Sequence, residues 1–212
     1  IDISGSNFFG SKSIFKNEYE TELAATLAFS ATKNNDKVGL ILFSDNVELY
    51  IPPKKGKSHV LRIIRELLEF KSKSKKTDIN VPLKFVSNIL KNKSIAFIIS
   101  DFISKDYSNS LKIFSSKHDV TGIRIYDQTE VIIPNLGVID INDNETGQRL
   151  TVNTGSKRVR KKYAEYYYSK RMEFTENFKM SGSGIIECNT QDDYQKKLLK
   201  YFESRWEYCL IF

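Results

Sequence analysis

Five oxygen-bearing side chains could together hold a metal ion: Asp2, Ser4, Ser6, Thr77 and Asp101. If Ile1 and Asp2 end a buried strand, the alternating Asp and Ser residues lie on a loop at its carboxyl edge, where Gly5 allows a tight turn. Asp101 ends another apolar run, so it is expected at a similar edge. Carboxylates and hydroxyls are hard donors that suit Mg²⁺. The pattern therefore predicts one divalent-cation site, with Mn²⁺ or Ca²⁺ as other ions for the same donors.

The elements that must position these donors alternate between strand and helix. Residues 38–43, 94–100 and 120–126 are nearly continuous apolar runs, typical of strands covered on both faces. Helical periodicity connects them, and residues 47–51 are expected to return as an antiparallel edge strand. The fold class is thus α/β, with a doubly wound, mostly parallel sheet and one antiparallel edge strand. Ligands of such sheets bind beyond the carboxyl ends of the strands.

The last third of the chain has a different pattern. Residues 138–154 alternate apolar and polar around a turn-rich centre, which predicts a β-hairpin. Ser156 is expected to begin a long helix, residues 185–188 a last strand, and Thr190 to cap a final helix. We therefore expect a single domain over residues 1–212, with 138–212 as a C-terminal extension.

Composition is consistent with one globular domain. The 212 residues are 40% apolar, and 33 Lys and Arg against 26 Asp and Glu give a net charge of +7. Cys188 and Cys209 fit no metal-binding spacing and are expected to be buried thiols, which favours a reducing, cytoplasmic setting. Because only Ile1 precedes Asp2, we interpret the chain as a fragment that lacks most of its first strand, and we expect Asp2 to be poorly restrained.

The order Asp2-x-Ser4-x-Ser6, Thr77, Asp101 resembles the metal-ion-dependent adhesion site of von Willebrand factor A domains. The longer phrases FSATKNNDKVGLILFSDNVELYIPPKKG, TDI and FIISDF are similar to the bacterial domain-of-unknown-function 58 family. That resemblance implies a von Willebrand factor A-like fold, membrane-spanning segments elsewhere in the full-length protein, and association with MoxR-type AAA+ ATPases. It also implies that an Asp or Glu of a partner protein completes the metal shell.

Function is accordingly expected to be protein binding without catalysis, through a bridging divalent cation and an acidic partner. Lys73, Lys75 and Lys76 precede Thr77 and would form a basic rim that attracts the partner. The simpler interpretation of residues 71–76 is a solvated loop.

Two alternatives remain open. Strand-terminal aspartates beside hydroxyls could hold Mg²⁺ for phosphoryl transfer, but Ser4 stands where haloacid-dehalogenase phosphatases carry a second Asp. Cations and tyrosines mix over residues 158–168, as in RNA-stacking surfaces, although an amphipathic helix explains them more simply. His59 and His118 have no evident catalytic partners in the sequence.

Overall fold

The computed structural model describes residues 1–5, 16–142 and 149–209. Three parallel strands form its centre: β3 (Ile95–Ser100), β4 (Asp119–Tyr126) and β7 (Gly184–Asn189). Two further strands, β1 (Val38–Phe43) and β2 (Val47–Lys54), pair antiparallel. A mixed α/β architecture with parallel and antiparallel strands is therefore present, as the sequence predicted.

The first three residues join these two groups of strands. The Ile3 N–H donates to the Phe43 carbonyl at 2.8 Å, and the Phe43 N–H donates to Ile1 at 3.0 Å. On the other side, the Asp2 N–H donates to the Ile99 carbonyl at 2.9 Å. Residues 1–3 thus lie between β1 and β3, which places Asp2 within the sheet and leaves β2 at its antiparallel edge.

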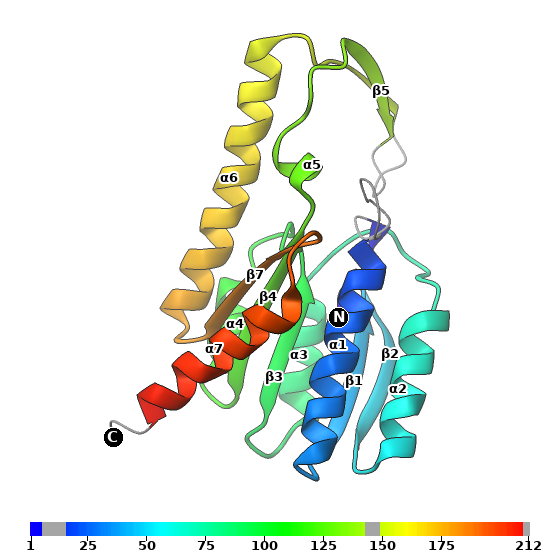
Figure 1. The fold of residues 1–212 in the computed structure, drawn as a ribbon, viewed down its shortest axis with the longest axis vertical. Helices are drawn as coiled ribbons and strands as arrows, with labels where there is room; N and C mark the ends of the chain where they lie inside the picture. Colours follow the sequence, from blue (N-terminus) through cyan, green and yellow to red (C-terminus); the bar gives the residue numbers. More distant parts are fainter. Residues whose placement is uncertain (6–15, 143–148, 210–212) are drawn as a thin grey trace.

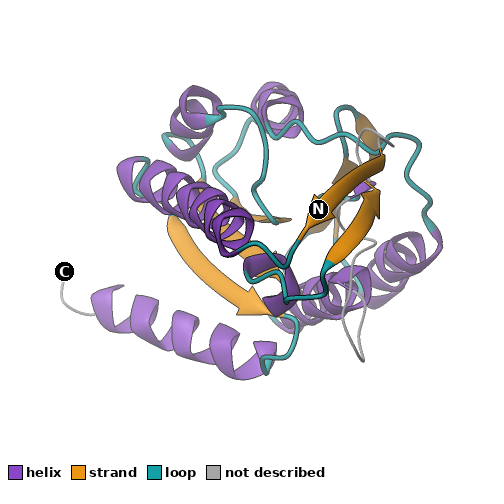
Figure 2. Ribbon diagram, turned by 90° about the horizontal axis from the view of Figure 1, so that it is seen from above, coloured by secondary structure: helices purple, strands orange, loops and turns teal. Residues whose placement is uncertain are grey.

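Helices cover both faces of the sheet (Figures 1 and 2). One face is covered by α1 (Lys16–Lys33), α2 (Lys57–Glu69) and α7 (Tyr194–Cys209); the other by α3 (Asn80–Ile89), α4 (Ser108–Ser115) and α6 (Lys157–Met180). On the first face, Leu23 packs with Ile99 and Ile123. On the second face, Phe114 and Phe174 pack with Val120. Apolar side chains that alternate along the strands thus feed two separate cores.

Gly122 permits the close approach of α6 to β4. A Cβ atom at this position would lie 2.5 Å from the Phe178 ring and 2.9 Å from the Phe174 ring. Glycine is therefore required here for packing, and the rings of α6 lie directly on the strand backbone.

The predicted β-hairpin is present as β5 (Val138–Asn142) and β6 (Arg149–Asn153), and its predicted turn lies outside the described residues. It follows the short helix α5 (Gln128–Val131), and with the first half of α6 it stands away from the sheet (Figure 1). The predicted cap at Thr190 is wrong, since α7 begins at Tyr194 and the Thr190 hydroxyl instead bonds Asp127 at 3.0 Å.

Cys188 is fully buried and unbridged, as expected. Within the described residues, no helix has the length and apolar character that crossing a bilayer requires.

Candidate metal centre

Asp2 and Asp101 lie on neighbouring segments at the carboxyl edge of the sheet. Asp2 belongs to the segment beside β3, and Asp101 directly follows that strand. Their exposed fractions are 0% and 2%. Two carboxylates from distant parts of the sequence are therefore brought into one buried region, because parallel neighbours end at the same edge.

Both carboxylate oxygens of Asp2 accept hydrogen bonds. The Ser4 N–H donates to Oδ1 at 2.9 Å, and the Ser100 hydroxyl donates to Oδ2 at 2.6 Å. Burial and the nearby charge of Asp101 nevertheless raise the pKa of Asp2. The expectation that Asp2 would be poorly restrained is thus wrong, because its neighbours in the sheet fix both its backbone and its carboxylate.

Asp101 is held by the turn that follows it. Its Oδ1 accepts the Ile103 N–H at 2.9 Å. Between them, Phe102 adopts a left-handed conformation with φ 60°, which is costly for a bulky residue. The Phe102 ring packs 4.4 Å from Phe174 and 5.2 Å from Phe178, measured between centroids. Packing against α6 therefore stabilises the turn that orients Asp101.

Ser4 and Thr77 are brought to the same edge. Ser4 is fully buried, and the Gly5 N–H donates to the Lys75 carbonyl at 3.0 Å. On the other side of Thr77, the Asp78 N–H donates to the Ser44 carbonyl at 3.1 Å, just after β1. Four of the five predicted ligands therefore gather at one edge, while Ser6 lies outside the described residues.

The predicted rim is solvent-exposed at Lys73, Lys75 and Lys76. Glu48 on β2 holds this loop, since its carboxylate accepts the Lys73 N–H at 2.7 Å and the Ser72 hydroxyl at 2.9 Å. Partial burial works to raise the pKa of Glu48, but these hydrogen bonds and one from Ser44 hold it below its usual value. The loop is therefore anchored beside Thr77, with these three lysines exposed to solvent.

Three further charged residues at the site were missed by the sequence analysis. Lys16 is fully buried, and its Nζ lies 3.1 Å from Asp101 Oδ2 and 3.5 Å from Glu130 Oε1. Glu20, one turn along α1, is 3% exposed, and its Oε1 has no hydrogen-bond partner among the described residues. A detectable signal existed, because both residues occupy the apolar stripe of α1 that includes Leu23 and Leu27.

The cluster has more acid than base. Burial raises the pKa of Glu20 well above its usual range and also raises the pKa of Glu130, although Lys16 opposes both shifts. Burial alone would lower the pKa of Lys16, but Asp101 and Glu130 raise it, so the ammonium keeps its charge. Three carboxyl groups thus act on one lysine, with Asp2 near Asp101, and the region favours additional positive charge.

Residues 1–173 match the family described as Protein of unknown function DUF58. The chain belongs to the DUF58 family. Among curated relatives of this DUF58 domain, the uncharacterized protein Rv1480 of Mycobacterium tuberculosis is 20% identical over 97% of the chain. The uncharacterized protein MAV169 of Mycobacterium avium is 24% identical over 54% of the chain and 68% of its own length. The DUF58 chain spans 65% of the length of Rv1480.

Two solved structures share the fold of this DUF58 domain. The conserved hypothetical protein BatB from Bacteroides thetaiotaomicron has a TM-score of 0.64 and 15% identity, covering 97% of this chain and 96% of its own. An aerotolerance-related membrane protein from Bacteroides fragilis, solved with multiple mutations to serines, has a TM-score of 0.61 and 16% identity, covering 96% of each chain. At these identities the likeness extends to the fold alone.

The donor set of the DUF58 domain fits a hard cation in its chemistry. Two carboxylates with hydroxyls beside them are suitable for Mg²⁺, which keeps several waters when proteins bind it. Among the described residues, no three His, Cys, Asp or Glu side chains are placed to hold a metal together. The donors that could hold a cation at this edge are the carboxylates of Asp2 and Asp101 and the hydroxyls of Ser4 and Thr77.

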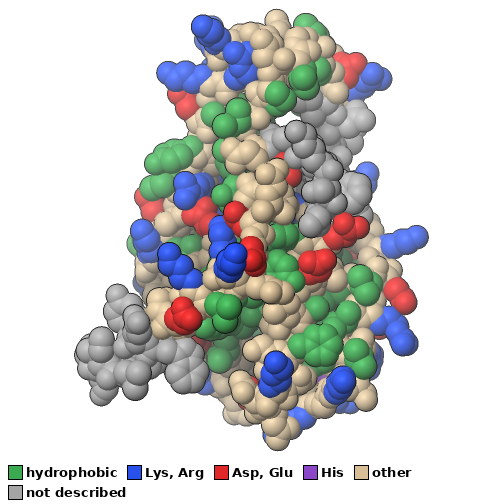
Figure 3. All heavy atoms as spheres, in the orientation of Figure 1, with side chains coloured by type: hydrophobic (Ala, Val, Ile, Leu, Met, Phe, Trp, Pro, Cys, Tyr) green, Lys and Arg blue, Asp and Glu red, His purple; other side chains and the backbone are tan. Residues whose placement is uncertain are grey.

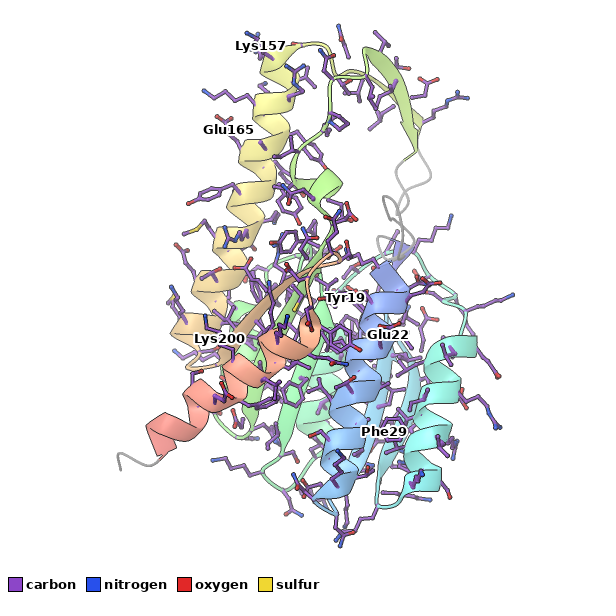
Figure 4. The ribbon with its side chains drawn as sticks, in the orientation of Figure 1. Tyr19, Glu22, Phe29, Lys157, Glu165 and Lys200 are labelled. Carbon is purple, nitrogen blue, oxygen red and sulfur yellow. The ribbon has the colours of Figure 1, made fainter. Side chains whose placement is uncertain are left out.

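Glu20→Gln is expected to flatten the pH dependence of stability. An acid whose pKa is raised by folding keeps its proton in the folded state above the pH at which the unfolded chain releases it, so stability falls as pH rises. The amide removes this loss. We expect the difference in unfolding free energy, variant minus wild type, to be about 1–3 kcal/mol larger at pH 8 than at pH 5. Urea denaturation at both pH values measures it. Glu22→Gln, an exposed position on α1 (Figure 4), is the matched control and should leave the pH dependence unchanged.

The tyrosines of α6 are not all available for stacking on a ligand. Tyr167 is buried, and its ring centroid lies 4.8 Å from the Arg124 guanidinium, which also lies 5.2 Å from the centroid of the Tyr126 ring. These residues border a cavity of about 490 Å³ between α5 and α6. Tyr166 and Tyr168 are exposed, and basic side chains gather at the end where α6 begins (Figure 3). Part of the predicted aromatic surface therefore serves internal packing.

Proposed function

We propose that this domain binds an acidic protein partner through a divalent cation, most suitably Mg²⁺, without catalysing a reaction. The ligands would be Asp2, Ser4, Ser6, Thr77 and Asp101, as in a von Willebrand factor A-like metal-ion-dependent adhesion site. The observation that carries this proposal is the gathering of the buried Asp2 and Asp101 carboxylates at one sheet edge, with an excess of acid around them.

Charge explains why such a site would take a partner's carboxylate. Two aspartates neutralise a divalent ion, and neutral hydroxyls and water complete its shell without adding charge. The ion can then exchange a water for one more anionic oxygen. Exposed lysines on the loop before Thr77 would add long-range attraction for an acidic surface.

The partner that the family resemblance suggests is a MoxR-type AAA+ ATPase, and we propose it as the first protein to test. We further propose a cytoplasmic location for this domain within a membrane-anchored full-length protein. One of the similar structures is described as a membrane protein, which accords with such an anchor.

Mn²⁺ binding tests the metal site directly. We expect the protein to bind Mn²⁺, measured by electron paramagnetic resonance of the free ion, and Thr77→Ala to weaken binding at least about tenfold, equivalent to about 1.4 kcal/mol. Thr77 is preferred to Asp101 for this test because its loss leaves the buried charges unchanged. Thr26→Ala on α1, whose hydroxyl bonds only the Glu22 carbonyl in the described structure, is the matched control and should bind as the wild type does.

Partner binding tests the rest of the proposal. A purified MoxR-type ATPase from the same organism should bind in Mg²⁺ and lose affinity in EDTA, as measured by calorimetry. Wild-type affinity in EDTA, or an unaltered Mn²⁺ affinity in Thr77→Ala, would contradict a cation-bridged site.

A further inference from the structure

The position beside Asp101 already holds a positive charge. The Lys16 ammonium lies 3.1 Å from Asp101 Oδ2, and the two side chains are 0% and 2% exposed. An ammonium so deeply buried is tolerated only with acids close by, and Lys16 has a second one in Glu130 at 3.5 Å. The Lys16 ammonium therefore neutralises the carboxylate that a bound metal would also neutralise.

We propose that Lys16 is a tethered competitor of the divalent cation, which must leave Asp101 before the metal binds fully. The inference rests on the proposed function and adds a means of regulating the same site. A divalent ion at Asp101 would repel the ammonium twice as strongly as a single charge would, at a separation where the buried surroundings screen little. Both cations cannot therefore share this carboxylate at full occupancy.

The structure offers Lys16 a second location. Glu20 lies four residues along α1, a spacing at which helical side chains are neighbours. It is buried, and its Oε1 lacks a hydrogen-bond partner among the described residues. Buried acceptors are nearly always satisfied, so this oxygen requires an explanation. A rotation of the lysine side chain from Asp101 to Glu20 would satisfy it while the contact with Glu130 is kept.

Such an exchange would couple the metal site to α5. Glu130 belongs to α5, which packs against α6, so Lys16 links the sheet edge to the C-terminal part of the chain. Any partner that displaces α5 would alter the hold on Lys16 and thereby the metal affinity. The lysine thus lowers the metal affinity until the metal, the partner or both together displace it from Asp101.

Lys16→Met removes the competing charge and keeps an unbranched apolar side chain of similar length. We expect this variant to bind Mn²⁺ at least tenfold more tightly than the wild type, measured by electron paramagnetic resonance of the free ion. Lys33→Met, exposed at the other end of α1, is the matched control and should bind as the wild type does. Circular dichroism establishes that both variants are folded.

The outcomes separate this inference from the proposed function. Equal Mn²⁺ affinity in the wild type and Lys16→Met overturns the competition and leaves the metal site standing. Absence of Mn²⁺ binding in both overturns the metal site and the competition with it.

If Lys16→Met does not fold, a crystal structure of the wild type from crystals grown in Mn²⁺ shows the position of Lys16 beside the bound metal. Lys16 should then lie on Glu20, and an ammonium still 3.1 Å from Asp101 beside a fully occupied metal overturns the inference.

Discussion

Phe174→Ala is expected to lower the free energy of unfolding by about 3–5 kcal/mol, the usual range for removing a fully buried phenylalanine. Phe174 is 0% exposed, and its ring centroid lies 4.4 Å from that of Phe102 and 4.9 Å from that of Phe178. Gly122 lies beneath these rings and has no side chain that could shift to fill the cavity. Urea denaturation followed by circular dichroism measures the loss.

Phe29→Ala is the matched control, because Phe29 is a helical phenylalanine with 37% of its surface exposed (Figure 4). Its loss should cost about 1 kcal/mol or less, as is usual for positions outside the core. Equal losses in the two variants would show that α6 is not a structural part of the domain. The result has a bearing on the site, because the same rings hold the turn after Asp101.

The fold was predictable where one residue pattern dominated. The continuous apolar run of β4 indicated a strand buried on both faces, and all its residues except Asp119 and Tyr126 are buried. The placement of Ile1 and Asp2 at a strand end was likewise expected, and residues 1–3 do make sheet hydrogen bonds with Phe43 and Ile99. Both predictions depended on local sequence alone.

Other boundaries depended on contacts between distant segments. β2 continues through Pro52 and Pro53 to Lys54, whereas the strand was expected to end at residue 51. An edge strand tolerates proline because its outer side makes no hydrogen bonds to another strand. Thr190 resembled a helix cap, but the buried Asp127 draws its hydroxyl away, and α7 begins later. Neither the edge position of β2 nor the contact of Thr190 with Asp127 is evident from the neighbouring residues in the sequence.

The candidate site shows the same division. Asp2, Thr77 and Asp101 could be proposed because acids and hydroxyls at strand ends follow a known order. The place of Lys16 on the apolar stripe of α1 could indicate its burial, but lysine is rarely buried and its two partners lie 85 and 114 residues away in the chain. The approach of Asp101 and of Glu130 on α5 to the start of α1 places this lysine between two acids.

Asp101→Ala is expected to cost about 3–5 kcal/mol of unfolding free energy in metal-free buffer, because breaking a buried pair leaves an uncompensated charge. Lys16 would retain only the longer contact with Glu130. The double variant Lys16→Met/Asp101→Ala should lose less than the sum of the two single variants, since it removes both buried charges together. Urea denaturation of the four proteins closes the cycle.

Lys196→Ala supplies the comparison with an exposed pair. Lys196 lies 3.5 Å from Asp193, with exposed fractions of 84% and 49%, and its loss should cost far less than the loss of Asp101. Additive losses at Lys16 and Asp101 would mean that the two charges do not depend on each other. Lys16 would then be unable to act as the cation of this site, and the competition with a metal would lose its physical basis even where metal binding itself persisted.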